Sequence, residues 1–234
     1  MNDRDFAASI AKVWKAASIM GLSESFSVPA SLAASDQFIE AARSPTATYE
    51  ELYLLGLETG QSNILLADYS YLQFSKTAAN GFRFAYYPNP FLSASKDAVK
   101  ELWEMREYVE EGVIDIEEFL HRVAELRKTQ HPPLVRYEHS PAQYVALRHP
   151  CSHFHLGHHA ENRWPVRRIL TPAAFGLLLL KLFYGEFWDE SKPFSTDGQQ
   201  DLTVDEVMSR CKQESRILPD DLFSPDEERQ FYLG

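Results

Sequence analysis

The stretch that decides the fold is "NILLADYSYLQFSKTAANGFRFAYYPNP", residues 63–90. Side chains alternate between two sets along residues 69–76, and a second run, "FRFAYY", follows Asn80 and Gly81. In a strand, successive side chains point to opposite faces, and Asn-Gly is a favoured turn between antiparallel strands. The pattern therefore predicts a β-hairpin and, with it, an antiparallel sheet at the centre of the fold.

Apolar residues at helical spacing flank this hairpin on both sides. Ser35 and Asp36 form a capping pair before one such segment, and Thr171-Pro172 is a favourable cap and first-turn proline for the most apolar one. Helices are predicted over residues 5–20, 35–43, 93–112, 115–128 and 171–188, with a short one at 203–213. Two further strands are predicted over residues 134–140 and 152–157.

The order of these elements predicts one α+β domain, in which helices pack on one face of an antiparallel sheet. We expect a helical part over residues 1–60, a sheet core over 61–190 and an acidic tail over 191–234. In the two helices over 93–128, the spacing predicts these inward side chains: Val99, Leu102, Trp103, Tyr108, Ile116, Phe119, Leu120 and Val123.

Length and composition exclude several classes of protein. The chain has 234 residues, 44% of them hydrophobic, so it is long enough to bury a sizeable core. Its most apolar segment, residues 175–188, contains Lys181 and is shorter than the roughly 20 residues that cross a bilayer. No N-terminal targeting signal is visible, and Cys151 and Cys211 lie far apart. We therefore expect a cytoplasmic protein with free thiols and no membrane contact.

Charge is distributed unevenly along the chain. The net charge of −11 argues against a protein uniformly adapted to nucleic acid, because phosphate contacts need Lys and Arg. From His121 to Arg168, however, eight Lys or Arg stand against three Glu, and all eight histidines of the protein lie in this basic window. If the protein acts on nucleic acid, we expect the basic residues of this window to lie together around a cleft. In a scaffold protein we expect them to be dispersed over the surface.

The most unusual stretch is "HPCSHFHLGHH", residues 149–159. If it forms a strand, His153 and His155 share one face, about 7 Å apart along the backbone, and Phe154 and Leu156 share the other. We expect the apolar pair to point into the core and the two histidines to stand on the more open face.

Three interpretations of these histidines remain open. They suit Zn²⁺ or a similar divalent ion, a pair of proton-transfer groups with pKa values near neutrality, or a polar strand face. Cys151 with His149 or His159 would have to complete a metal site, and no Cys-x-x-Cys or His-Glu-x-x-His pair occurs. We therefore expect no cofactor and little or no tightly bound zinc. A weaker alternative joins Asp68 and Lys76 in a nuclease-like motif that lacks a second acid.

Basic residues near the histidines suggest a phosphate site. If the two later strands pair, Arg136 stands across from the histidine face, where its guanidinium can hold two phosphate oxygens. Tyr137 is assigned a positioning role in the same site. Arg167, Arg168 and Arg148 are further candidate phosphate contacts, the first two assisted by the N-terminus of the following helix. The alternative is that these arginines are solvated or form surface ion pairs.

At this point the residues carry a family resemblance. "YLQFS", "FRFAYYPNP", "RYEHSP", "HPCSHFHLG", "RWPV" and "LTPAAFGLLLLKLFY", in this order, resemble the bacterial family known as domain of unknown function 2290. The resemblance implies a bacterial cytosolic protein and brings no activity with it. More distantly, "RYEHSP" with a later His-x-His is similar to small toxins of toxin–antitoxin systems that are thought to be nucleases.

Two functions from different classes follow as hypotheses. The first is a nuclease-like effector, in a toxin or phage-defence context, that cleaves a phosphodiester, with RNA favoured. His153 and His155 would act as base and acid, and Arg136 would stabilise the charged transition state. The second is a non-catalytic interaction or metal-binding module, whose acidic remainder faces a basic protein partner. Nucleic acid would bind through the basic window in the first case.

Overall fold

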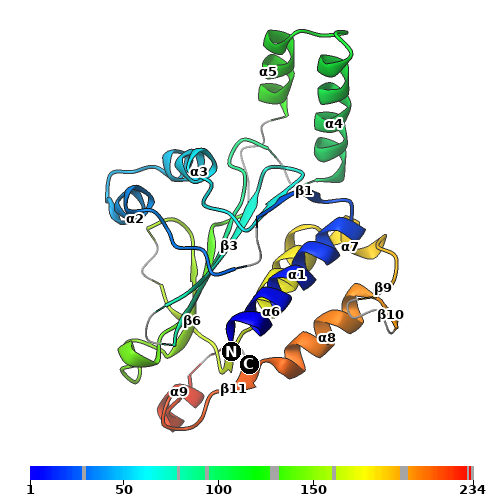
Figure 1. Ribbon diagram of the computed structural model, residues 1–234. Coiled ribbons are helices and arrows are strands. Elements are labelled where there is room, and N and C mark those ends of the chain that lie inside the picture. The colour runs from blue at the N-terminus through cyan, green and yellow to red at the C-terminus, as the bar shows by residue number, and fades with distance from the viewer. Residues whose placement is uncertain are drawn as a thin grey trace.

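The computed structural model describes residues 1–27, 30–77, 80–92, 95–126, 132–159, 162–195, 200–230 and 232 (Figure 1). Its helices are α1 (Asp3–Ile19), α2 (Asp36–Arg43), α3 (Tyr49–Glu58), α4 (Lys96–Glu110), α5 (Ile116–Glu125), α6 (Pro172–Phe183), α7 (Gly185–Asp189), α8 (Val204–Glu214) and α9 (Pro225–Glu228). Its strands are β1 (Ser23–Phe26), β2 (Ile64–Leu66), β3 (Tyr71–Lys76), β4 (Phe82–Tyr87), β5 (Val135–His139), β6 (Ser152–Leu156), β7 (Trp164–Pro165), β8 (Arg168–Ile169), β9 (Phe194–Ser195), β10 (Asp201–Leu202) and β11 (Arg216–Ile217).

The centre of the fold is a seven-stranded sheet in the order β1 to β7, and every neighbouring pair is antiparallel. The α+β class and the hairpin around Asn80-Gly81 are confirmed, since Tyr71 pairs with Tyr87 across β3 and β4. Strands β5 and β6 also pair as expected. Helix α3 and strands β1 and β2 were not predicted, because their short apolar runs carry neither a clear helical nor a clear strand period.

One face of the sheet is apolar and packs against α1 and α6 (Figure 1). Phe175 of α6 touches the rings of Phe84 and Phe154, and burial of one such side chain contributes about 1.5–3 kcal/mol. The two helices cross closely, because a Cβ at Gly176 would lie 2.6 Å from the methyl groups of Val13. Helices α1 and α6 thus lie together on this face of the sheet.

The other face of the sheet is divided into an apolar part and a polar part. Helices α2 and α3 cover the apolar part, where Phe38 and Tyr53 pack against Tyr71 and Tyr87. Beyond these helices the same face becomes polar, and its side chains on β3 to β6 are Gln73, Ser75, Arg83, Arg136, Glu138, His153 and His155. The sheet register therefore brings together polar residues that are scattered along the sequence.

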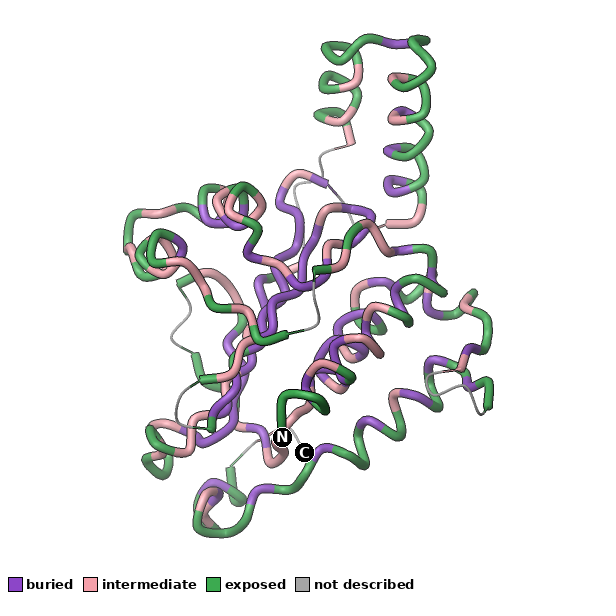
Figure 2. The backbone as a smooth tube through the Cα atoms, viewed as in Figure 1, coloured by how far each residue is buried: buried purple, intermediate pink, exposed green. Residues whose placement is uncertain are grey.

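Helices α4 and α5 form an arm that stands away from the body (Figures 1 and 2). The prediction that Trp103, Tyr108, Ile116 and Leu120 point inward is wrong. Ile116 is 57% exposed and Leu120 is 59% exposed, and α5 buries no residue. Helical spacing shows that a helix has an apolar stripe but not whether a partner covers that stripe within the same chain.

The segment over residues 191–234 is not a free tail in the residues described. Helix α8 packs against α6, and its Val207 and Cys211 belong to the main core. Further on, Leu218 and Phe223 pack around Cys151. Both cysteines are free and buried, which agrees with the expectation of free thiols. Within the part of the chain that the structure covers, no helix combines the length and the apolar character needed to cross a membrane.

Candidate functional site

Strand β6 places the two central histidines in the interior. Phe154 packs on the apolar face as predicted, but Leu156 is 37% exposed, so its expected burial is wrong. His153 and His155 lie on the opposite face as predicted, yet they are 0% and 7% exposed rather than open to solvent. The ring of His149 packs edge-on against His153, and this contact helps to close the site. The histidine face is therefore a buried polar cluster.

The two imidazoles contact each other directly. Nδ1 of His153 lies 2.8 Å from the carbonyl oxygen of Pro150. Because a carbonyl oxygen only accepts, Nδ1 carries the hydrogen of the neutral ring and Nε2 carries the lone pair. That Nε2 lies 3.0 Å from Nε2 of His155. In this arrangement His155 donates to His153, and the two rings do not stand on opposite sides of a space for substrate.

The electrostatic state of His153 differs from the sequence expectation. Burial lowers the pKa of His153 to about 4, and the neighbouring His155 acts in the same direction, while the bond to Pro150 opposes it. The ring is therefore neutral at pH 7. A proton-transfer role with a pKa near neutrality does not match this environment, whereas a neutral imidazole is the form that binds metal ions.

Glu138 lies across the strand pair from His153 and joins the cluster. Its carboxylate Oε1 accepts a hydrogen bond from Nε of Arg83 at 3.0 Å. Burial would raise the pKa of Glu138, but the electrostatic influence of Arg83 foremost, and of the neighbouring histidines and Arg136, lowers it overall. Glu138 is therefore ionised. Ligand atoms of Glu138, His153 and His155 lie within 4.8 Å of one another, so these are the residues able to hold a metal ion.

Arg136 is the predicted phosphate residue that the structure does place beside the histidines, since it pairs with His155 across β5 and β6. Its Nε is buried and has no hydrogen-bond partner among the residues that the structure describes. Arg136 and Glu138 line a cavity of about 320 Å³ between α2 and the sheet. The other cationic residues lining this cavity are Arg43, Lys76 and Arg83.

Sequence reasoning did not assign these three cationic residues to a phosphate site, although it named Lys76 in the weaker nuclease-like motif with Asp68. They lie outside the basic window, on α2, β3 and β4. A count of charges along the sequence detects only local clusters, whereas the pairing of β3, β4 and β5 brings distant residues together. The strand alternation that puts Ser75, Arg83 and Arg136 on one face was the available signal.

Tyr137 does not lie with Arg136. It points to the apolar face, where its hydroxyl donates toward Arg168 O at 3.2 Å and accepts from the amide of Leu170 at 3.0 Å. The expectation that Tyr137 positions phosphate beside the histidines is therefore wrong in its geometry, because neighbouring residues of a strand face opposite ways. Its observed contacts hold the segment before α6 against the sheet.

The remaining predicted phosphate residues do not line the cavity of Arg136 and Glu138. Arg167 forms ion pairs with Asp220 and Glu228, both at 3.0 Å, and Arg168 donates to the carbonyl oxygen of Ser215. Arg148 lines a separate cavity of about 400 Å³. Of the rest of the basic window, Arg127 and Lys128 lie outside the described residues. The described arginines of the window are therefore dispersed over separate sites.

Two other histidines of the opening stretch have structural contacts. Nε2 of His158 and Nε2 of His159 lie 2.8 and 2.9 Å from the carbonyl oxygen of Ala47, which precedes α3. They tie the end of β6 to the segment between α2 and α3. The histidine-rich stretch thus contains a buried pair and an anchoring pair with different surroundings.

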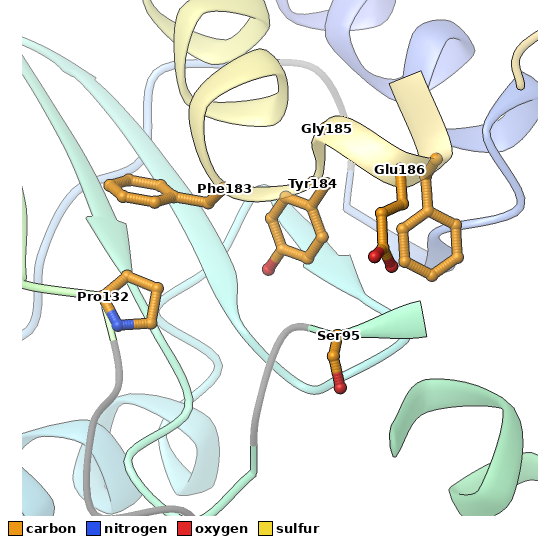
Figure 3. Close-up of a pocket in the computed structure, with 7 residues that line it drawn as sticks. Ser95, Pro132, Phe183, Tyr184, Gly185 and Glu186 are labelled. Carbon is orange, nitrogen blue, oxygen red and sulfur yellow. The ribbon is translucent and has the colours of Figure 1, made fainter. Parts of the chain in front are cut away.

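A second buried polar cluster surrounds Asp68. Its carboxylate accepts from Ser70, through both the amide and the hydroxyl at 2.9 Å, and from the Tyr184 hydroxyl at 2.8 Å. Tyr184 also lines a cavity of about 260 Å³ (Figure 3). Lys76 forms an ion pair with Asp3 at 2.6 Å instead of joining Asp68. The cluster satisfies its own hydrogen bonds, so we assign it to the stability of the fold.

Comparison with known proteins gives one family. A search of curated proteins and a search of solved structures each found no significant match. The model of the family described as "Uncharacterized conserved protein (DUF2290)" matches residues 23–233. This range spans the sheet, the buried histidines and the α4–α5 arm. The chain therefore belongs to the DUF2290 family.

Proposed function

We propose that this protein is a hydrolase that cleaves a phosphodiester at the cavity beside the Glu138, His153 and His155 cluster. The observation that carries the proposal is Arg136 at the wall of that cavity, whose buried Nε has no hydrogen-bond partner in the described part of the chain. A buried N–H group without a partner costs about 1–3 kcal/mol, and an anionic oxygen of a ligand would satisfy it.

The charges around the cavity fit a phosphoryl group. Arg43 and Arg83 join Arg136 along its walls, and Glu138 is the carboxylate beside them, whereas Lys76 borders the cavity but pairs its ammonium with Asp3. Guanidinium groups hold two phosphate oxygens at once and stabilise the charge that develops in the transition state. Of the three residues in the buried cluster, Glu138 is the one that lines the cavity. The cluster therefore acts on an attacking water in the cavity through Glu138.

The placement of the arginines and the size of the cavity favour a small substrate. Arginines of the basic window lie on α5, at the cavity of Arg136, at the separate cavity of Arg148 and beside the C-terminal segment. A long nucleic acid needs cations along a continuous path. A cavity of about 320 Å³ instead supports a small phosphodiester or one end of a chain. RNA remains a candidate substrate in that terminal form.

Hydrolysis of bis(p-nitrophenyl) phosphate and of short RNA and DNA oligonucleotides tests the proposal. The assay is run with metal-free protein and again with added ZnSO4 or MnCl2. We expect turnover by the wild type and a loss of about 10²–10⁴-fold in kcat for Glu138→Gln. Arg148→Ala, at the other cavity, is the matched control and should keep full activity. The absence of hydrolysis above the Glu138→Gln background under all these conditions would overturn the proposal.

A second function is favoured by the α4–α5 arm, which we propose binds a basic protein partner. Residues 96–125 carry ten Asp or Glu against four Lys or Arg. The arm also exposes the large side chains of Trp103, Tyr108, Val113, Ile116 and Leu120. Interfaces commonly combine apolar anchors with complementary charge at the rim. This function is compatible with catalysis at the cavity, because the arm stands apart from the sheet (Figure 1).

A further inference from the structure

We propose that Glu138, His153 and His155 bind one divalent transition-metal ion, and that Zn²⁺ fits these ligands best. Among the residues that the structure describes, they are the one group of three potential ligands with their donor atoms close enough to share an ion. Two imidazoles and one carboxylate are a protein ligand set of catalytic zinc sites, in which water takes the fourth position. This inference reverses the expectation of little or no tightly bound zinc.

The distance between the two ring nitrogens suits an ion with little rearrangement. The two Nε2 atoms of His153 and His155 lie 3.0 Å apart. Two nitrogens at 2.0–2.1 Å from a tetrahedral Zn²⁺ lie about 3.3 Å apart. A shift of a few tenths of an ångström, with the ring hydrogen of His155 moving from Nε2 to Nδ1, therefore replaces the direct contact between the rings with two bonds to the ion. The ligands are held by paired strands, since Glu138 stands opposite His153 in the register of β5 and β6.

The surroundings of the ligands favour the metal-binding form. Nδ1–H of His153 donates to Pro150 O, and metal-binding histidines generally donate their other ring N–H to such an oxygen. This bond fixes the tautomer that directs the Nε2 lone pair at the cluster. On Glu138, the bond from Arg83 uses Oε1, which leaves Oε2 for the ion. The charge of the carboxylate partly offsets that of the ion in the buried site.

The position of the ion next to the cavity suggests its use. Glu138 belongs both to the cluster and to the cavity wall that carries Arg136. An ion at such a site lowers the pKa of its bound water toward about 7 and so supplies a nucleophile at neutral pH. This catalytic use rests on the proposed hydrolysis, whereas binding of the ion does not and is measured without any substrate.

Calorimetric titration of ZnSO4 into the full-length protein, after dialysis against EDTA and then buffer, tests the inference. We expect one equivalent of Zn²⁺ to bind to the wild type. Glu138→Gln and His155→Ala should each weaken the Kd by at least about 100-fold, the upper range for loss of an outer-shell partner. His121→Ala removes an exposed imidazole from α5 and should leave the Kd unchanged.

Zinc-edge X-ray absorption of the wild-type complex gives an answer even where a variant fails to fold. The spectrum should fit two imidazoles with oxygen ligands, and a sulfur ligand would overturn the site. The absence of stoichiometric binding, or binding that Glu138→Gln and His155→Ala leave unchanged, would also overturn it. Zinc bound at this site without hydrolysis would refute only the proposed function. Full hydrolysis by protein that binds no divalent ion would refute only the metal site.

Discussion

The Nε2 atoms of His153 and His155 lie 3.0 Å apart in the interior of the protein. Two groups that act as base and acid on one substrate need that substrate between them. The direct contact therefore argues against separate roles as base and acid. It favours one shared role for the two histidines, next to Glu138. It also makes them part of the fold, because both are buried and one bonds to the backbone.

This burial predicts a measurable effect on stability. His153→Ala should lower the free energy of unfolding by about 1–3 kcal/mol, because it leaves the carbonyl of Pro150 without its donor. The measurement is urea unfolding of metal-free protein, so that loss of a bound ion does not contribute. His121→Ala should stay within about 0.5 kcal/mol of the wild type. Equal stability of His153→Ala and wild type would mean that the ring is not buried as described.

The different burial of the two apolar residues of β6 predicts different losses of stability on substitution. Phe154→Ala should cost about 3–5 kcal/mol, since the ring packs against Phe175 and Tyr137 in the main core. Leu156→Ala should cost much less, because Leu156 is 37% exposed. Thermal and urea unfolding of the two variants side by side provide the check. Similar losses for both would restore the expectation that the two residues share the core.

The Asp68 cluster predicts a pH dependence of stability. Burial raises the pKa of Asp68, although hydrogen bonds from Ser70 and Tyr184 oppose this shift. A carboxyl with a raised folded pKa is protonated more readily in the folded state, so its contribution is full below the unfolded pKa and is lost as pH rises through the folded pKa.

Asp68→Asn removes this titration. We therefore expect the stability of the wild type relative to Asp68→Asn to fall as pH rises from about 4 to 7. Chemical unfolding of both proteins across this range measures the difference. A constant difference, or one that grows in favour of the wild type with pH, contradicts the assignment.

The α4–α5 arm predicts substitutions that change binding and not stability. Ile116→Glu and Leu120→Glu should each change the free energy of unfolding by no more than about 0.5 kcal/mol, because both residues are exposed. A designed helical peptide with lysines on one face and leucines on the other serves as the basic probe. It should bind the wild type in a salt-dependent way and bind both variants more weakly. Equal binding by all three proteins would argue against the arm as a docking surface.

The sequence predicts the framework of this site better than its chemistry. Alternation around Asn80-Gly81 and in "SHFHLG" is a local property, and it correctly predicts the hairpin, β6 and the shared face of His153 and His155. Burial is not local. Neither the covering of the histidine face nor the exposure of Leu156 follows from the period of a strand.

The pairing of strands that are distant in the sequence explains the other differences between the predicted site and the observed one. Arg83 meets Glu138 only because β4 and β5 pair, although α4 and α5 lie between these strands in the sequence. Tyr137 was assigned to the same site as Arg136, yet strand geometry places the two side chains on opposite faces of the sheet. The arm was misjudged for a similar reason, since Phe119 and Val123 of the apolar stripe of α5 pack against α4, whereas Ile116 and Leu120 of the same stripe are exposed.

The most direct test of the central claim is the kcat/KM for phosphodiester hydrolysis of the wild type, Arg136→Ala and Arg136→Lys, measured with and without added ZnSO4. We expect Arg136→Ala to lose about 10²–10³-fold, because the guanidinium stabilises charge in the transition state. Arg136→Lys should recover only part of this loss, since an ammonium does not hold two oxygens in the same plane. Melting temperatures should confirm that all three proteins are folded. Wild-type hydrolysis that is unchanged in Arg136→Ala, or no hydrolysis by any of the three, would contradict the assignment of chemistry to this cavity.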